Sequence, residues 1–90
     1  MSSSFKKVAA AQKNLEIGKQ LKKKGSFQEA IAKYNMALKL IPDNIPALLQ
    51  LASVYEAQEN WKEVVKCCRK IVAFQPNNAR AYLQQARALK

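Results

Sequence analysis

Apolar residues recur along this chain at intervals of three and four, which is the period of an α-helix. Two stretches show it most clearly, one from 27 to 41 and one from 61 to 72. The first stripe consists of Phe27, Ala30, Ile31, Tyr34, Ala37, Leu38 and Ile41, and the second of Trp61, Val64, Val65, Cys68, Ile71 and Val72. No segment alternates apolar and polar residues over the length of a strand. The pattern predicts an all-α chain of five helices, at roughly 5–24, 27–40, 45–58, 61–74 and 79–90.

Prolines and their neighbours mark where these helices end and begin. Pro42 lacks an amide donor and is expected to end one helix. Asn44 is a favourable N-cap for the next helix, and Pro46 falls in its first turn, where a missing N–H matters little. The same sequence of signals returns at Pro76 and Asn78, each lying 34 apart from its counterpart.

Other helix ends carry signals of their own. Ser26 and Glu29 form a Ser-x-x-Glu sequence, which predicts a capping box at the start of the second helix. Asn60 and Glu63 give the asparagine version at the start of the fourth. Gly25 suits the left-handed residue that closes the preceding helix.

The 34-residue spacing extends through the whole chain and indicates an internal repeat. We divide the sequence into an N-terminal extension (1–10), a first repeat (11–44), a second repeat (45–78) and a partial third repeat or capping helix (79–90). A unit of this kind cannot bury its apolar face alone, so its neighbours must stack on it. The sequence leaves open whether the last helix is a cap or the chain is a module cut from a longer protein.

At these positions the chain resembles the tetratricopeptide repeat family, whose 34-residue units are pairs of antiparallel helices, A and B. The first repeat matches the family pattern at Ile17, Gly18, Leu21, Ala30, Tyr34, Ala37 and Pro42. The second matches it at Leu48, Leu51, Ala52, Tyr55, Val64, Cys68, Ile71 and Pro76. The resemblance covers residues 11–90 and implies an α-solenoid. Asn14 and Gln85 depart from the pattern, because both stand where an apolar residue is expected.

The two cysteines, Cys67 and Cys68, are neighbours in sequence, and a disulfide between them would be strained. We expect free thiols and a reducing compartment. Cys68 replaces an aromatic residue of the family pattern and is predicted to pack in the core, whereas Cys67 is predicted to be more exposed. Phe27, Tyr34, Tyr55 and Trp61 are also assigned to the core.

Composition narrows the possible functions without naming one. The chain has no histidine, no Cys-x-x-Cys sequence and no Gly-rich phosphate loop, so we predict no metal, no cofactor and no catalytic site. The formal net charge of +10 favours acidic partners, nucleic acid or an anionic surface. No apolar run is long enough for a membrane span or a secretory signal. A soluble cytoplasmic protein is therefore expected.

The resemblance implies that a ligand binds along the concave surface, which the A helices line. Residues 34 apart on that face form four rows: 12/46/80, 15/49/83, 19/53/87 and 22/56/90. The second row consists of leucines and predicts an apolar strip flanked by basic and amide groups. The predicted groove consists of Gln12, Leu15, Lys19, Lys22, Leu49, Gln50, Ser53, Arg80, Leu83, Gln84 and Arg87. It would suit a peptide segment with apolar and acidic residues. The alternative is that the leucines pack against neighbouring helices or against another copy of the chain.

Some members of the family hold the C-terminal carboxylates of a chaperone with a Lys/Asn/Asn/Lys/Arg clamp. The matching positions here are Leu15, Lys19, Gln50, Arg80 and Gln84. Only Arg80 keeps the charge expected at its position, so a carboxylate clamp is disfavoured.

The sequence thus predicts a non-catalytic scaffold or adaptor that binds a segment of another protein. One alternative is an interaction or oligomerisation segment of a larger multidomain protein, which could be an enzyme. Another is nucleic-acid binding through the basic surface, as in pentatricopeptide repeats, although no aromatic platform is left for base stacking. Self-association through the leucines or the open end of the stack is a further possibility.

The lysines at 22–24 fall at a helix C-terminus, where the helix dipole favours positive charge.

Overall fold

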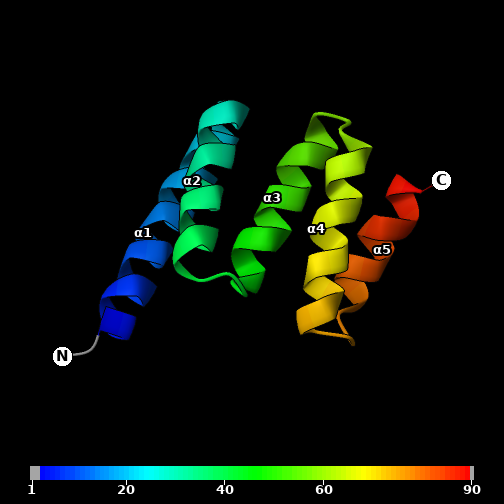
Figure 1. Cartoon of the computed structure of the whole chain (residues 1–90). Helices are drawn as coiled ribbons and strands as arrows, with labels where there is room; N and C mark the ends of the chain where they lie inside the picture. Colours follow the sequence, from blue (N-terminus) through cyan, green and yellow to red (C-terminus); the bar gives the residue numbers. More distant parts are fainter. Residues whose placement is uncertain (1–2, 90) are drawn as a thin grey trace. The chain divides into compact units, whose positions relative to one another are not determined.

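A computed structural model describes residues 3–89, and within them the chain is helical apart from short turns. The helices are α1 (Ser3–Lys23), α2 (Phe27–Leu40), α3 (Ile45–Ala57), α4 (Trp61–Phe74) and α5 (Ala79–Ala88) (Figure 1). The prediction of an all-α chain with five helices is confirmed, and the ends lie within two residues of those predicted. Lys90, which the last predicted helix included, lies outside the described residues.

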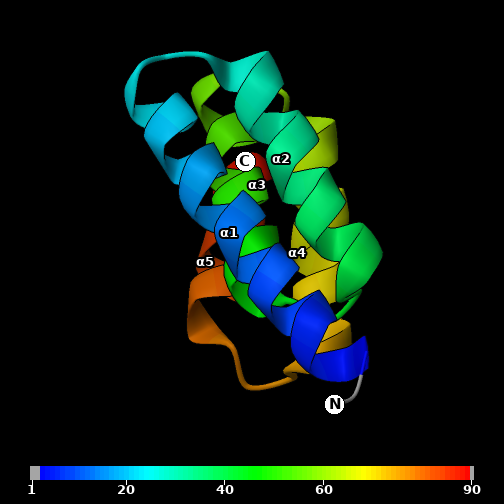
Figure 2. The ribbon, with the colours of Figure 1, turned by 90° about the vertical axis from the view of Figure 1, so that its left-hand side faces the viewer.

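The chain forms two compact units, Met1–Ala47 and Leu48–Lys90. In the first unit, α1 and α2 run antiparallel and lie side by side (Figures 1 and 2). In the second, α3, α4 and α5 follow one another as antiparallel neighbours, and α4 packs directly against α5 (Figure 1). Each unit therefore contains at least one pair of helices that pack directly against each other.

The core of the first unit is built around a close approach of α1 to α2. Tyr34 of α2 is fully buried, as are Ala30 and Ala37 one turn away on either side. Gly18 of α1 lies against the Tyr34 ring, because a Cβ atom at Gly18 would come within 2.5 Å of Tyr34 Cε1. The absence of a side chain at Gly18 thus provides the room that the aromatic ring fills.

The core of the second unit is more aliphatic. Its fully or almost fully buried side chains include Leu48, Ala52, Val54, Val64, Cys68, Ile71 and Ala81. The prediction that Cys68 packs in the core is confirmed. The prediction that Cys67 is more exposed is wrong, because α4 is covered on two of its faces and buries both thiols. Trp61 was also assigned to the core, but it is the first residue of α4 and remains 38% exposed.

The turns after α1 and α3 share one hydrogen-bond pattern. Ser26 N–H donates to the Leu21 carbonyl at 2.9 Å, and Gly25 N–H donates to the Lys22 carbonyl at 3.0 Å. This is the Schellman arrangement, and Gly25 has the left-handed φ of 80° that it requires. At the equivalent place in the turn after α3, Glu59 has a φ of 57°.

The same turns explain why the predicted capping boxes do not form. Ser26 and Asn60 stand at the N-cap positions of α2 and α4, but neither side chain makes a capping hydrogen bond. In a capping box the N-cap N–H donates to the glutamate three residues on. Here the Ser26 N–H is already bonded to Leu21, and the Asn60 N–H is bonded to the Tyr55 carbonyl at 2.9 Å. Each of these residues ends one helix and begins the next, so its N–H is not free to donate to the glutamate of a capping box.

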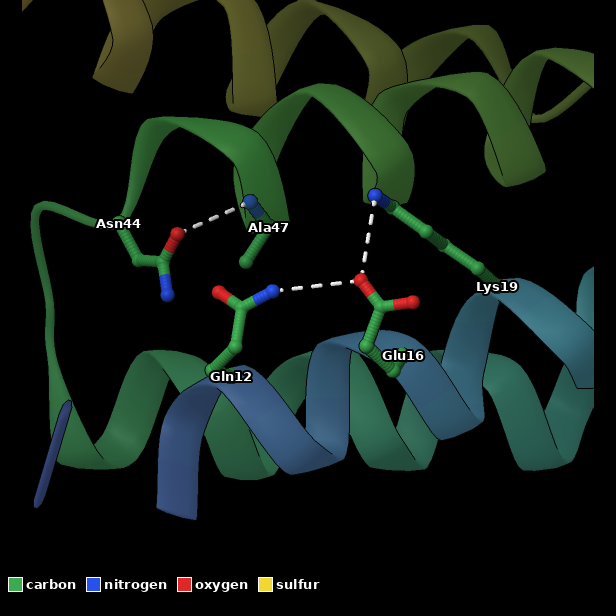
Figure 3. Close-up of polar contacts among 5 residues, drawn as sticks. All are labelled: Gln12, Glu16, Lys19, Asn44 and Ala47. Atoms are coloured by element: carbon green, nitrogen blue, oxygen red, sulfur yellow. Dashed lines mark hydrogen bonds and ion pairs between the residues drawn. The ribbon is translucent and has the colours of Figure 1, made fainter. Parts of the chain in front are cut away.

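The proline turns agree with the sequence interpretation. Asn44 N–H donates to the Ile41 carbonyl at 3.1 Å, and Asn78 N–H to the Gln75 carbonyl at 3.0 Å, so each turn encloses one proline. Asn44 Oδ1 then accepts from Ala47 N–H at 3.2 Å (Figure 3), and Asn78 Oδ1 accepts from Ala81 N–H at 3.0 Å. These two asparagines are therefore true N-caps, each satisfying an amide that the helix leaves unpaired.

Candidate functional site

The first unit contributes the predicted groove residues of α1. Glu16 is the centre of a small polar cluster there, because it accepts a hydrogen bond from Gln12 Nε2 at 3.2 Å and pairs with Lys19 Nζ at 3.6 Å (Figure 3). Lys22 is half-buried on the same side of the helix. Leu15 does not fit the prediction of an open apolar strip. It is 3% exposed, because it belongs to the core rather than to a ligand-facing surface.

The second unit contributes the remaining predicted residues, from α3 and α5. Leu49, Gln50 and Ser53 of α3 are half-buried. On α5, Arg80 and Arg87 are exposed, and Leu83 is 59% exposed. Gln84 was also predicted to face the groove, but it is buried, because it lies on the face of α5 that packs into the unit.

An ion pair joins the two A-type helices of this unit. Arg87 Nε donates to Glu56 Oε2 at 3.0 Å, and Arg87 Nη2 donates to Glu56 Oε1 at 3.3 Å. This two-pronged geometry fixes α5 beside α3 more specifically than a single bond does. Leu83 lies one turn before Arg87 and Leu49 two turns before Glu56, about 6 and 10 Å along their helices. The leucines of α3 and α5 therefore share the face that carries the ion pair.

The second unit thus presents one mixed surface, which we call the A-helix face. It consists of Leu49, Ser53, Glu56, Arg80, Leu83 and Arg87. Arg80 makes no salt bridge with a described residue, whereas Arg87 is committed to Glu56. The face therefore offers an exposed leucine on α5, a more covered leucine on α3 and one available guanidinium group. These groups can hold an apolar side chain and a carboxylate of a ligand.

This chain is similar to proteins of a known family. The family model described as "Tetratricopeptide repeat" matches residues 21–89. The chain belongs to the tetratricopeptide repeat family. It is also 32% identical over 93 aligned residues to the mitochondrial import receptor subunit TOM70 of Rattus norvegicus. That alignment covers 98% of this chain but 15% of the relative, so the chain spans about a seventh of the length of the protein it matches.

Membership in this family fits the resemblance noted from the spaced residues. Tetratricopeptide repeats generally mediate protein–protein interactions and are generally not catalytic. The division into individual repeats at 11–44, 45–78 and 79–90 stays a prediction, although the equivalent turns at Gly25 and Glu59 follow the same spacing.

Exposure around α5 divides this tetratricopeptide helix into three faces about 120° apart. Ala81 and Gln84 lie on the buried face, with Gln85 and Ala88 partly covered beside them. Arg80, Leu83 and Arg87 lie on the A-helix face. The third, outer face carries Tyr82, Ala86 and Leu89, and all three are exposed. By the 34-residue spacing, these residues are equivalent to Leu48, Ala52 and Tyr55.

Two buried polar atoms have no hydrogen-bond partner among the described residues, the Tyr34 hydroxyl and Gln84 Oε1. Burial raises the pKa of the Tyr34 phenol, so it stays neutral. Each lies inside a helix-packing surface. Neither atom lies beside a titratable or nucleophilic group that would make a catalytic centre.

The thiols are equally unsuited to nucleophilic chemistry. Burial raises the pKa of the Cys67 thiol to about 12, and the neighbouring Cys68 adds to the shift while Lys70 opposes it. Burial also raises the pKa of Cys68, with Glu56 adding and Arg87 opposing. A reactive cysteine needs a lowered pKa and access to solvent, and these two have neither.

Within residues 3–89, no helix is both long and apolar enough to cross a membrane. In the same range, no three Cys, Asp or Glu side chains form a group that could hold a metal ion. Lys22 and Lys23 lie in the last turn of α1, where positive charge opposes the negative end of the helix dipole.

Proposed function

We propose that this chain is a non-catalytic interaction module that binds a peptide segment of a partner protein on the A-helix face of α3 and α5. The observation that carries the proposal is the exposed Leu83, which lies one turn from Arg87 and three residues from Arg80 on the same side of α5. Arg87 is paired with Glu56, so the leucine is an apolar anchor with the guanidinium group of Arg80 available beside it. It suits a segment that combines an apolar residue with acidic ones.

Charge supports the same class of partner. The chain carries 16 basic and 6 acidic residues, so its field attracts an acidic segment from any direction. The sequence does not keep the carboxylate-clamp pattern, because Leu15 and Gln84 stand where the clamp needs a cation, and both side chains are buried. We therefore propose apolar anchoring with acidic flanks rather than capture of a chain terminus.

The predicted groove residues of α1, namely Gln12, Lys19 and Lys22, remain candidates for further contacts in the first unit. The relative is named as a receptor subunit of mitochondrial import, and a receptor surface for protein segments is consistent with the proposal. A scaffold or adaptor role in the cytoplasm also remains a proposal, and the two free cysteines suit that reducing compartment.

A defined peptide library tests this proposal. Displayed peptides of random sequence are selected against the folded chain, and the selected peptides are measured by fluorescence anisotropy against the wild type and Leu83→Asp. We expect peptides rich in apolar and acidic residues, whose binding weakens at least about tenfold in the variant, as at an anchoring residue.

The matched control is Tyr82→Asp, which places the same charge on the outer face of the same helix. Selected peptides should bind this control as they bind the wild type. Equal binding to Leu83→Asp and the wild type would overturn the proposal. A single-stranded RNA probe that binds more tightly than any peptide, with steep salt dependence, would favour the nucleic-acid alternative instead.

A further inference from the structure

Glu56 is the single acidic residue in the four rows of equivalent positions on the A helices, namely 12/46/80, 15/49/83, 19/53/87 and 22/56/90. The residues that share its row in the other two repeats are Lys22 and Lys90. The middle A helix therefore carries a charge opposite to that of its counterparts, in a set of positions that is otherwise basic, uncharged polar or apolar.

The place of Glu56 in α3 does not favour its charge. Glu56 lies in the last turn of the helix, where the negative end of the helix dipole disfavours a carboxylate, and this turn contains no basic residue. Lys22, in the last turn of α1, has the favourable sign. Glu56 is compensated instead by Arg87 of α5, whose Nε and Nη2 donate to its two carboxylate oxygens at 3.0 and 3.3 Å. A contact between helices thus holds this carboxylate in place.

The ion pair sets the charge that a ligand meets at this end of the A-helix face. The side chain of Arg87 is 51% exposed and that of Glu56 is 25% exposed, so a ligand can approach both charges. The two charges sum to zero. A carboxylate of the ligand that comes near Arg87 also comes near Glu56, and the attraction and the repulsion largely cancel. Glu56 thereby removes Arg87 as a second cation beside Leu83.

The opposite end of the same face is positive. Arg80 is exposed and makes no salt bridge with a described residue. Since α3 and α5 run in the same direction (Figure 1), both helices begin at this end, and neither has an acidic residue in its first turn. The positive ends of their dipoles therefore add to the charge of Arg80. Leu83 lies between the two ends, about 4.5 Å from Arg80 and about 6 Å from Arg87 along the helix axis.

We propose that Glu56 is a specificity-determining residue of the A-helix face, because its pairing with Arg87 confines the attraction for acidic residues to the Arg80 side of Leu83. This inference rests on the proposed function and narrows its ligand. The ligand is a segment whose acidic residues lie on one side of the apolar anchor, while the side over the ion pair is uncharged. Without Glu56, the face would carry a cation on either side of Leu83 and would attract acidic residues on both.

A pair of matched peptides tests the role of Glu56. A displayed peptide is selected from a random library against the wild type, with binding that Leu83→Asp weakens, and an alanine scan locates its apolar anchor. Two versions are synthesised, a one-sided peptide with acidic residues on the selected side of the anchor and glutamines on the other, and a two-sided peptide with acidic residues on both. Fluorescence anisotropy gives the ratio of their dissociation constants. We expect the two to agree within about twofold for the wild type, whereas Glu56→Gln should bind the two-sided peptide at least about fivefold more tightly.

Three further variants check the sign of the effect. Arg87→Gln leaves Glu56 without its partner, so the two-sided peptide should bind at least about threefold more weakly than the one-sided peptide. Replacing both residues by glutamine should bring the ratio back to within about twofold. The control is Glu63→Gln, which removes the same charge from α4, where Glu63 pairs with Lys66 at 3.3 Å, and should keep the ratio of the wild type. Circular dichroism melting establishes that each variant is folded.

The proposed function and this inference fail in different ways. If no selected peptide depends on Leu83, the proposed function is overturned, and the role of Glu56 with it. If selected peptides depend on Leu83 but the ratio in Glu56→Gln equals that in Glu63→Gln, the role of Glu56 alone is overturned. A two-sided peptide that the wild type binds at least about fivefold more tightly would also overturn it, because Arg87 would then attract acidic residues despite its partner.

Discussion

The helix pairs α1–α2 and α3–α4 carry different residues at equivalent positions of the 34-residue repeat. In the first pair Gly18 lies against Tyr34, a small residue beside a large one. In the second pair the equivalent positions hold Ala52 and Cys68, both completely buried. The second pair gains one methyl group on the A helix and loses an aromatic ring on the B helix, so these two positions together hold less volume. The larger Val64 and Ile71, which are buried where α2 has Ala30 and Ala37, offset that loss along α4.

The same comparison holds at the turns. Gly25 and Glu59 both take the left-handed conformation that closes an A helix, with φ of 80° and 57°. Glycine adopts this conformation without a steric penalty, and glutamate does not. The first repeat is thus adapted at its turn and has an unpaired hydroxyl in its core, whereas the second repeat is strained at its turn.

The largest expected effect on stability comes from replacing Gly18 and Tyr34 by the residues found at the equivalent positions of the second repeat. Tyr34→Cys in the first unit should leave a cavity and lower the free energy of unfolding by about 3 kcal/mol. Gly18→Ala should lower it by about 1–3 kcal/mol, because the new Cβ would overlap the Tyr34 ring. The double variant reproduces the pair found in the second repeat, and its loss should be smaller than the sum of the two. Urea unfolding followed by circular dichroism measures all three.

The coupling between these two positions decides the interpretation. An interaction free energy of about 1 kcal/mol or more in the double-mutant cycle would show that a Cβ at position 18 and the ring at position 34 compete for the same space. Losses that add within about 0.5 kcal/mol would show that the two residues act independently, and the comparison of the pairs would lose its basis.

A second difference between the units concerns alkaline pH. Position 67 carries a buried thiol in the second repeat, and the equivalent residue in the first is the half-buried Lys33. The pKa of Cys67 rises from an ordinary value of 9.0 to about 12 in the folded chain. Above pH 9 the unfolded chain therefore loses a proton that the folded chain retains. Stability is full below pH 9 and falls by about 1.4 kcal/mol per pH unit above it.

This effect can be measured in the second unit, since Trp61 is the single tryptophan of the chain and lies in α4. Urea midpoints from its fluorescence should fall between pH 8.5 and 10, and the fall should be reduced in Cys67→Ala. The window ends at pH 10, because tyrosines also titrate above it and the pKa values of Tyr34 and Tyr55 are raised by burial. An unchanged pH dependence in Cys67→Ala would mean that another group causes it.

Much of this fold can be read from the sequence, because its signals are local. Apolar spacing gave the five helices, and the prolines with Asn44 and Asn78 gave two of the turns. The failures involve neighbours that a helical pattern does not identify. Nothing in a single stripe tells that Cys67 is covered from a second side, that Leu15 and Gln84 face inward, or that Trp61 at a helix start stays open. The capping boxes failed for a related reason, since the N–H groups that they need were already bonded to the preceding helix.

The candidate site shows the same division. Rows of equivalent residues put Arg80, Leu83 and Arg87 on one side of α5, and the structure shows that all three are exposed. They could not show that Arg87 is paired with Glu56, because that bond joins residues 31 apart on different helices. The repeat gives Tyr82 and Leu89 the same register as Leu48 and Tyr55, but it does not give their exposure, which is 49% and 64% in the structure.

The strained turn gives the smallest of these effects and the sharpest contrast between the repeats. Glu59→Gly should raise the free energy of unfolding by about 1 kcal/mol, because it removes a left-handed β-carbon while the two hydrogen bonds of the turn stay in place. Gly25→Ala should lower it by a similar amount. No atom lies within 4 Å of a Cβ built at Gly25, so the loss would come from the backbone conformation alone.

Glu59→Ala is the matched control, since it removes the same carboxylate but keeps the β-carbon. If Glu59→Ala stabilised the chain as much as Glu59→Gly, the charge at the end of α3 rather than the backbone would be responsible. Opposite shifts at Gly25 and Glu59, with little change in Glu59→Ala, would show that the two repeats use one turn, for which only the first has the suited residue.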